Sequence, residues 1–165
     1  MAPSYANIFK GELEKRLLKD ALVKPSLYRR FIDDIFCIFE VPETQLIEFI
    51  EYMNEAHPTI KCTADYSEES AIFLATRVHV DQENRRVYTE LYTKETDTHN
   101  YLHCTSCHPK HCKKGGSYGE FLRMRRNCYK IEEYYRYLNE RVQDYIHRGY
   151  PEIDLRDAQK RARER

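Results

Sequence analysis

The sequence predicts an α+β fold in which antiparallel strands form a sheet layer backed by helices. Two observations predict it: apolar residues recur at helical spacing in several segments, and β-favouring runs lie between those segments. Short turns join neighbouring β-favouring runs as hairpins, so the predicted pairing is antiparallel. The 165 residues suit one domain, or one domain with a small additional lobe.

The first predicted element is an amphipathic helix from Ser4 to about Lys19, which ends before Pro25. Its apolar residues recur every four positions, at Tyr5, Phe9, Leu13 and Leu17.

Asp33 and Asp34 lie in the middle of the apolar, β-favouring run 30–39. Because aspartate disfavours strands, this run is predicted to be a hairpin whose tight turn carries both carboxylates. One interpretation is a solvated turn that only separates two strands. The other is a metal site, because aromatic-x-Asp-Asp on a hairpin is the signature with which nucleic-acid polymerases hold magnesium against nucleotide phosphates.

Further segments complete the predicted sheet and its backing. A helix is expected over 43–55 and a strand over 59–63. A second hairpin is expected to pair 71–80 with 87–93 across a turn of four or five residues. These strands and helices make up the first predicted region, residues 1–96.

The second predicted region, residues 97–165, begins where the composition shifts to His, Cys, Lys and Gly without a clear period. After Ser117, a short helix is expected around Phe121. A strongly amphipathic helix follows over 131–146, and Gly149-Tyr150-Pro151 is predicted to stop it.

Charge is distributed unevenly, although 27 basic and 27 acidic side chains balance. Residues 40–70 contain eight acids and one base, whereas residues 101–130 contain seven bases and one acid. A solvated helix face would explain the basic segment, but the interleaved tyrosines favour contacts with nucleic-acid phosphates and bases. The predicted nucleic-acid-binding residues are Lys110, Lys113, Lys114, Arg123, Arg125 and Arg126.

The longest uninterrupted apolar run, 35–39, is far shorter than the roughly 20 residues that cross a bilayer. We therefore expect no membrane partner and an intracellular location, in the nucleus rather than the cytoplasm. The six cysteines are then expected to be reduced or bound to metal. A zinc site would use Cys104, Cys107, His111 and Cys112. Because zinc sites usually draw a second ligand pair from farther along the chain, a polar loop facing nucleic acid is the preferred interpretation.

Eight short blocks follow one another along nearly the whole chain. They are Met1–Asn7, Arg30–Phe36, Ile72–Leu74, Leu91–Lys94, Asp97–Leu102, Ser106–His111, Leu122–Arg126 and Arg148–Pro151. In residues and in order, this series resembles the C-terminal part of the reverse transcriptase domain of Penelope-like retroelements.

The resemblance implies an RNA-directed DNA polymerase that uses Mg²⁺, an RNA template and a DNA primer. It implies a partial polymerase palm over 1–96, with helices on one face of an antiparallel sheet, and a basic connector with a helical, thumb-like lobe over 97–165. Asp33 is implied as the direct magnesium ligand, with Asp34 as its supporting carboxylate.

Two-metal nucleotidyl transfer needs carboxylates that bridge the two ions, and two neighbouring aspartates of one hairpin cannot supply them alone. In the resembling family, a third aspartate and the fingers lie upstream of the helix with which this sequence begins. We therefore expect a fragment that is inactive without an upstream palm and fingers segment. The alternatives are a nucleic-acid-binding module without catalysis and a decayed retroelement remnant.

Overall fold

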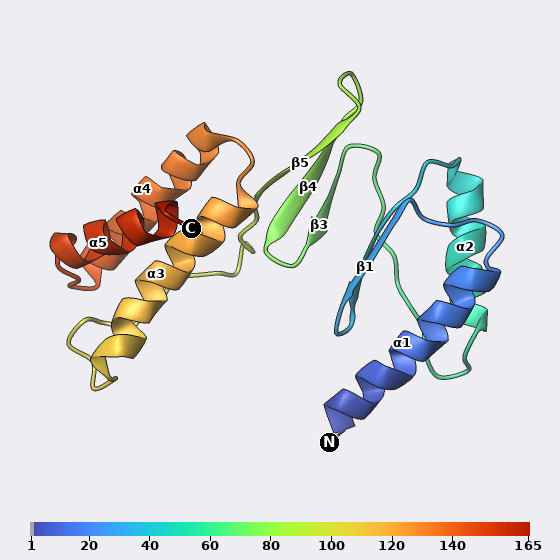
Figure 1. Ribbon diagram of the computed structural model, residues 1–165, viewed down its shortest axis with the longest axis horizontal. Helices are drawn as coiled ribbons and strands as arrows, with labels where there is room; N and C mark the ends of the chain where they lie inside the picture. The colour runs from blue at the N-terminus through green and yellow to red at the C-terminus, as the bar shows by residue number, and fades with distance from the viewer. Residues whose placement is uncertain (1) are drawn as a thin grey trace. The chain divides into compact units, whose positions relative to one another are not determined.

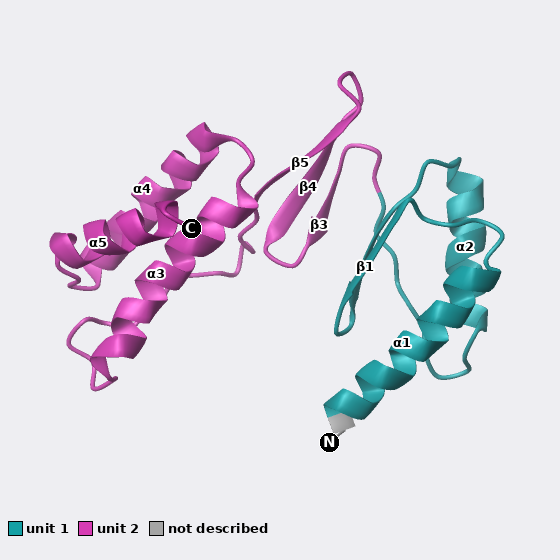
Figure 2. Cartoon of the chain, viewed as in Figure 1, with its two compact units in different colours: residues 1–66 teal, residues 67–165 magenta. Residues whose placement is uncertain are grey.

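The computed structural model describes residues 2–165, which form five α-helices and two small antiparallel sheets (Figure 1). This confirms the predicted α+β class. The chain divides into two compact units, Met1–Tyr66 and Ser67–Arg165 (Figure 2). The functional division at residues 96 and 97 stays a prediction. None of the described helices combines the length and the apolar character needed to cross a membrane.

The first unit contains helix α1 (Ala2–Asp20), strands β1 (Leu27–Phe31) and β2 (Asp34–Ile38), and helix α2 (Glu43–Glu55). The two helices and the hairpin were predicted from the sequence and are confirmed. Figure 1 shows both helices on the same side of the hairpin. The carboxylate of Glu43, in the first turn of α2, interacts favourably with the positive end of the helix dipole.

Aromatic and polar contacts pack α2 against the rest of this unit. The ring of Phe39, just after β2, lies edge-on to the ring of buried Phe49, with the ring centroids 4.9 Å apart. The hydroxyl of Tyr52 donates to the carbonyl of Leu17 at 3.3 Å, which links α2 to α1. The two helices and the hairpin therefore pack together as one small α+β unit.

The strand predicted over 59–63 is wrong, because this segment is irregular in the structure. The side chain of Asn54 donates to the Cys62 carbonyl at 3.0 Å and accepts from the Cys62 amide at 2.6 Å. Lys61 also donates to the Asn54 carbonyl. An alternating pattern becomes a strand only when a neighbouring strand satisfies its backbone, and here a side chain does so instead.

The second unit begins with a sheet of strand order β3-β4-β5, formed by Ser70–Phe73, Thr76–Asp81 and Arg86–Leu91. The single strand predicted over 71–80 is wrong, because the chain turns at Leu74 and Ala75 and pairs with itself. Leu74 has φ 58°, which permits this two-residue turn. The turn of four or five residues predicted before β5 is confirmed, because four residues separate Asp81 of β4 from Arg86 of β5.

Three helices follow the sheet: α3 (Lys110–Asn127), α4 (Ile131–His147) and α5 (Glu152–Arg163). The prediction for α4 is confirmed, and Gly149, with φ 80°, follows its end. The predicted start of α3 near Ser117 is wrong, because the helix continues back through two glycines that weaken its periodic pattern. Helix α5 was not predicted.

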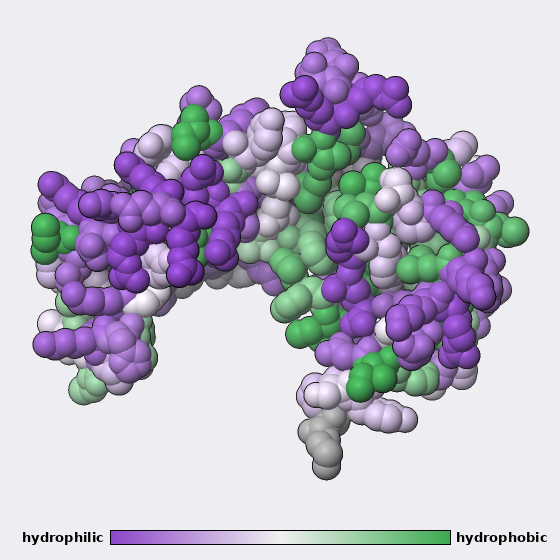
Figure 3. All heavy atoms as spheres, in the orientation of Figure 1, coloured by the Kyte–Doolittle hydropathy of each residue, from purple (hydrophilic) through white to green (hydrophobic). Residues whose placement is uncertain are grey.

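The core of this unit lies between the three helices and the sheet. Leu91 of β5 is buried in the same cluster as side chains from all three helices. The largest fully buried side chains are Tyr134, Phe121, Met124, Leu138 and Leu155. The face of these helices seen in Figure 3 is mostly hydrophilic, with scattered hydrophobic side chains. This pattern is typical of helices that bury one stripe and solvate the other.

Candidate metal-binding hairpin and basic helix

The two predicted aspartates lie at the end of the β1–β2 hairpin, where Asp33 is in the turn and Asp34 begins β2. Phe31 pairs with Asp34, so Ile32 and Asp33 form a two-residue turn. The side chain of Asp33 is 79% exposed, and Asp34 is also exposed. Ile32 has φ 55°, a strained conformation for a β-branched residue, and such strain is concentrated at functional sites. Asp33 therefore lies in a constrained turn, Asp34 follows it as the first residue of β2, and both carboxylates are accessible.

A polar face of α1 fixes this hairpin. Arg30 Nε of β1 lies 2.7 Å from Glu14 Oε1, and these side chains are only 16% and 15% exposed. The hydrogen bond to Glu14 raises the pKa of the Arg30 guanidinium. Arg30 also donates to Asn7 Oδ1 at 3.1 Å and to the Ile32 carbonyl at 3.0 Å. One guanidinium therefore connects the helix to the turn that carries Asp33.

Lys10, on the same face of α1, forms a hydrogen-bonded ion pair with Asp33. In contrast, the carboxylate of Asp34 forms no hydrogen bond or ion pair with the side chain of another described residue. Sequence reasoning missed the contributions of Asn7, Lys10 and Glu14. Their spacing was an available signal, because residues three and four apart share one helix face.

Burial affects two other side chains of the hairpin next to α1. Tyr28 and Cys37 lie directly opposite each other in the strand register. Burial, with the nearby Glu14 carboxylate, raises the pKa of the Cys37 thiol to about 11 and also raises the pKa of Tyr28. Both groups are protonated at neutral pH. Cys37 is therefore a packing residue rather than a reactive thiolate or a metal ligand.

The donor chemistry of the turn fits magnesium. Mg²⁺ prefers oxygen ligands and is usually bound through one or two carboxylates together with water and substrate phosphates. Asp33 and Asp34 provide two such carboxylates. Within residues 2–165, β1 and β2 form a two-stranded sheet, and no group of three or more His, Cys, Asp or Glu side chains is arranged to hold a metal ion.

The cysteines and histidine of the predicted zinc alternative lie on both sides of the start of α3. Cys104 and Cys107 belong to the preceding loop, whereas His111 and Cys112 occupy the first turn of the helix. Cys107, His111 and Cys112 are exposed, and Cys104 is half-buried. Adjacent helical residues point about 100° apart, so the helix separates the directions of its two candidate ligands. The preferred interpretation, a polar loop, stays a prediction.

Three of the six predicted phosphate-binding side chains are used within the protein. Lys113 donates to two backbone carbonyls of the preceding loop, at 2.7 and 3.0 Å. Lys114 pairs with Asp154 of α5 at 3.0 Å, and Arg123 pairs with Glu120 at 2.8 Å. Lys113 therefore helps to hold the loop and Lys114 helps to hold α5, whereas the Arg123–Glu120 pair lies within α3. Their sequence positions did not indicate these contacts.

The other three, Lys110, Arg125 and Arg126, are exposed and have no hydrogen-bonded or charged partner among the described residues. They lie at opposite ends of α3. At a rise of 1.5 Å per residue, the two ends are separated by about 22 Å. The structure therefore offers two separate cationic positions rather than one continuous basic patch.

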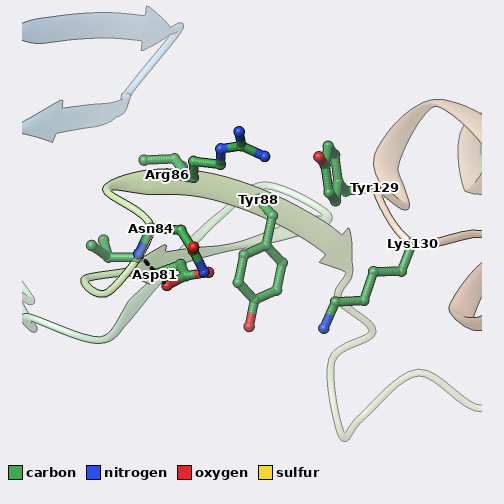
Figure 4. A pocket seen from close by; sticks show the side chains of 8 residues that line it. Asp81, Asn84, Arg86, Tyr88, Tyr129 and Lys130 are labelled. Carbon is green, nitrogen blue, oxygen red and sulfur yellow. Dashed lines mark hydrogen bonds between the residues drawn. The ribbon is translucent and has the colours of Figure 1, made fainter.

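An open pocket of about 370 Å³ lies between the β4–β5 hairpin and the α3–α4 connection (Figure 4). Tyr88 and Lys130 both line it, and the Lys130 ammonium lies 4.7 Å from the centroid of the Tyr88 ring. The Tyr88 ring also stacks on His79, with the ring centroids 4.7 Å apart. Tyr129 is 66% exposed, and its amide donates to the Thr89 carbonyl at 2.8 Å. An exposed aromatic ring in the same pocket as a cation suits a nucleic-acid base and a phosphate.

The basic segment 101–130, with its interleaved tyrosines, includes Tyr129 and Lys130 of this pocket. The pocket residues of the β4–β5 hairpin were not predicted, because they come from a separate segment. Neither a family model, nor a curated protein, nor a solved structure matches this chain.

Proposed function

We propose that this chain is part of a Penelope-type RNA-directed DNA polymerase in which Asp33 and Asp34 hold magnesium at the nucleotidyl-transfer site. The observation that carries the proposal is the pair of exposed carboxylates at the end of a hairpin, one in its constrained turn and one directly after it. The partly buried Arg30–Glu14 pair supports it, because a catalytic turn must be held rigidly.

In this proposal, residues 1–96 belong to the palm and residues 97–165 form the basic connector and thumb-like lobe. Magnesium, when bound, lowers the pKa of the primer hydroxyl and stabilises the leaving pyrophosphate. The chain's own part is to present the carboxylates of Asp33 and Asp34 and to keep their turn in place through Arg30. A strand beside the hairpin, from an upstream palm segment, supplies the third carboxylate. The chain by itself then does not extend a primer.

The metal role can be tested with Mn²⁺, a paramagnetic substitute for Mg²⁺. In ¹⁵N-labelled protein, we expect Mn²⁺ to broaden the amide signals of residues 31–36 first. The double variant Asp33→Asn/Asp34→Asn should weaken this effect at least about tenfold, because both ligands lose their charge. Asp65→Asn, an exposed aspartate elsewhere in the same unit, is the matched control. Broadening that is equally strong along the acidic segment 40–70 would contradict a specific site.

The nucleic-acid role predicts a defined salt dependence for binding an RNA–DNA duplex. Three phosphate contacts contribute about −2.7 to the slope of log K against log salt concentration. The triple variant Lys110→Gln/Arg125→Gln/Arg126→Gln should lose about this much slope in fluorescence anisotropy titrations at several salt concentrations. The control Lys15→Gln/Arg16→Gln/Lys19→Gln removes the same charge from α1 and should leave the slope unchanged. A salt-independent affinity would exclude phosphate binding.

A second candidate function is nucleic-acid binding without catalysis. The pocket of Tyr88, Tyr129 and Lys130 favours it, because it combines an exposed ring with a cation and lies far along the sequence from the aspartates. This alternative predicts salt-dependent duplex binding together with no selective effect of Mn²⁺ on residues 31–36. The two experiments above therefore distinguish the two functions.

A further inference from the structure

We infer that Lys10 is an internal counter-cation that a divalent metal ion must displace from Asp33. This inference rests on the proposed metal role of Asp33 and identifies a control on the same site. Lys10 would set the metal concentration at which the turn becomes occupied, so that the site stays closed to weakly binding cations.

In the Lys10–Asp33 ion pair, the lysine lies on the protein side and the aspartate on the solvent side. Lys10 Nζ binds Oδ1 of Asp33 from the side of α1. Lys10 is the more enclosed partner, with its side chain 30% exposed against 79% for Asp33. The lysine therefore approaches from the protein side, while the aspartate remains open to solvent and to an incoming ion.

The acidic side chain nearest to Lys10 along this face of α1 does not compete with Asp33 for its ammonium. Glu14, the next acid on this face of α1, is already paired with Arg30 at 2.7 Å. Asp33 is the only described carboxylate with which Lys10 forms an ion pair. In the metal-free chain, the ammonium thus neutralises the charge that a metal ion would use.

Charge repulsion sets the size of the expected effect. A divalent ion on Asp33 would lie within roughly 4 Å of an ammonium that kept its place, or it would have to expel that ammonium into water. Either route weakens metal binding. For a double charge beside a single charge in water screened by salt, the expected weakening is about tenfold.

The test measures Mn²⁺ binding to the whole chain from the electron paramagnetic resonance signal of the free ion, with amide broadening to locate the bound ion. Lys10→Met and Lys10→Gln should each lower the Mn²⁺ dissociation constant about tenfold. Lys10→Arg keeps the charge and should stay close to the unchanged protein. Lys15→Met is the matched control, because Lys15 is an exposed lysine of α1 that pairs with Glu12.

The experiment distinguishes failure of the Lys10 inference from failure of the proposed metal site. If Asp33→Asn weakens Mn²⁺ binding but both neutral variants at Lys10 bind it no more tightly than the unchanged protein, the counter-cation inference is wrong and the proposed site survives. If Asp33→Asn leaves Mn²⁺ binding unchanged, or the unchanged protein and its Lys10 variants show no Mn²⁺ bound at the turn, the proposed metal role and this inference both fail. Circular dichroism melting of each variant confirms that the comparison is made between folded proteins.

Discussion

Leu155→Ala should destabilise the second unit by about 3 kcal/mol. Leu155 belongs to α5, is 1% exposed, and is one of the largest fully buried side chains. Its replacement removes buried methyl groups and leaves a cavity that the rigid helices around it fill only in part. Urea unfolding followed by circular dichroism at 222 nm measures the loss as a lower midpoint with an unchanged slope.

Ile153→Ala is the matched control for this prediction. Ile153 is also a branched aliphatic residue of α5, two positions away, but it is 74% exposed. Its truncation should change the unfolding free energy by no more than about 0.5 kcal/mol. Equal effects of the two substitutions would show that α5 does not pack on α3 and α4 through the face described above.

Helix α5 shows why part of the fold was not predictable from sequence. Its buried stripe consists of Leu155, Ala158 and Ala162, of which only the leucine is a large apolar residue. Alanine does not stand out in a search for apolar periodicity, yet small side chains let helices approach closely. In α4, by contrast, the large apolar side chains of Tyr134, Leu138 and Tyr145 mark the buried face plainly, and the prediction was confirmed.

The errors in the strands have a related cause. Residues 59–63 and 71–80 both have β-favouring sequences, but a strand exists only with a partner. Asn54 satisfies the backbone of Cys62 from the side, and Leu74 adopts a left-handed conformation that no simple propensity predicts for leucine. Pairing is a tertiary property, so local patterns overestimate strands that have no neighbour and miss turns within longer runs.

The candidate site, like the fold, could be predicted from the sequence only in part. Asp33 and Asp34 were identified because two carboxylates in an apolar run are locally conspicuous. Lys10, which pairs with Asp33, and Arg30, which links the hairpin to α1, were not identified as parts of the site. Charged residues are common on helix faces and on strands, and their role depends on what they pack against. The hairpin was thus predictable as a turn with two carboxylates, but not the ion pairs that fix and neutralise it.

Glu14→Ala should destabilise the first unit by about 3 kcal/mol, because it leaves the partly buried Arg30 guanidinium without its carboxylate. This lies at the lower end of the cost of breaking a buried pair, since both side chains keep some contact with water. Glu14→Gln keeps a hydrogen-bond acceptor for Arg30 and should cost less. Glu12→Ala, at an exposed position of the same helix where Glu12 pairs with exposed Lys15, should have little effect.

The reactivity of the Cys37 thiol measures the loss of the Glu14–Arg30 ion pair without unfolding the protein. Burial raises the pKa of its thiol to about 11, and the Glu14 carboxylate contributes to that increase. Glu14→Ala removes the negative charge and loosens the hairpin, so the pKa of Cys37 should fall and its alkylation by iodoacetamide at pH 8 should become faster. Mass spectrometry of the peptide containing Cys37 separates this thiol from the other five. If Cys37 reacts at the same rate in the unchanged protein, Glu12→Ala and Glu14→Ala, the ion pair does not anchor the hairpin, and the turn that carries Asp33 must be held in place by other contacts.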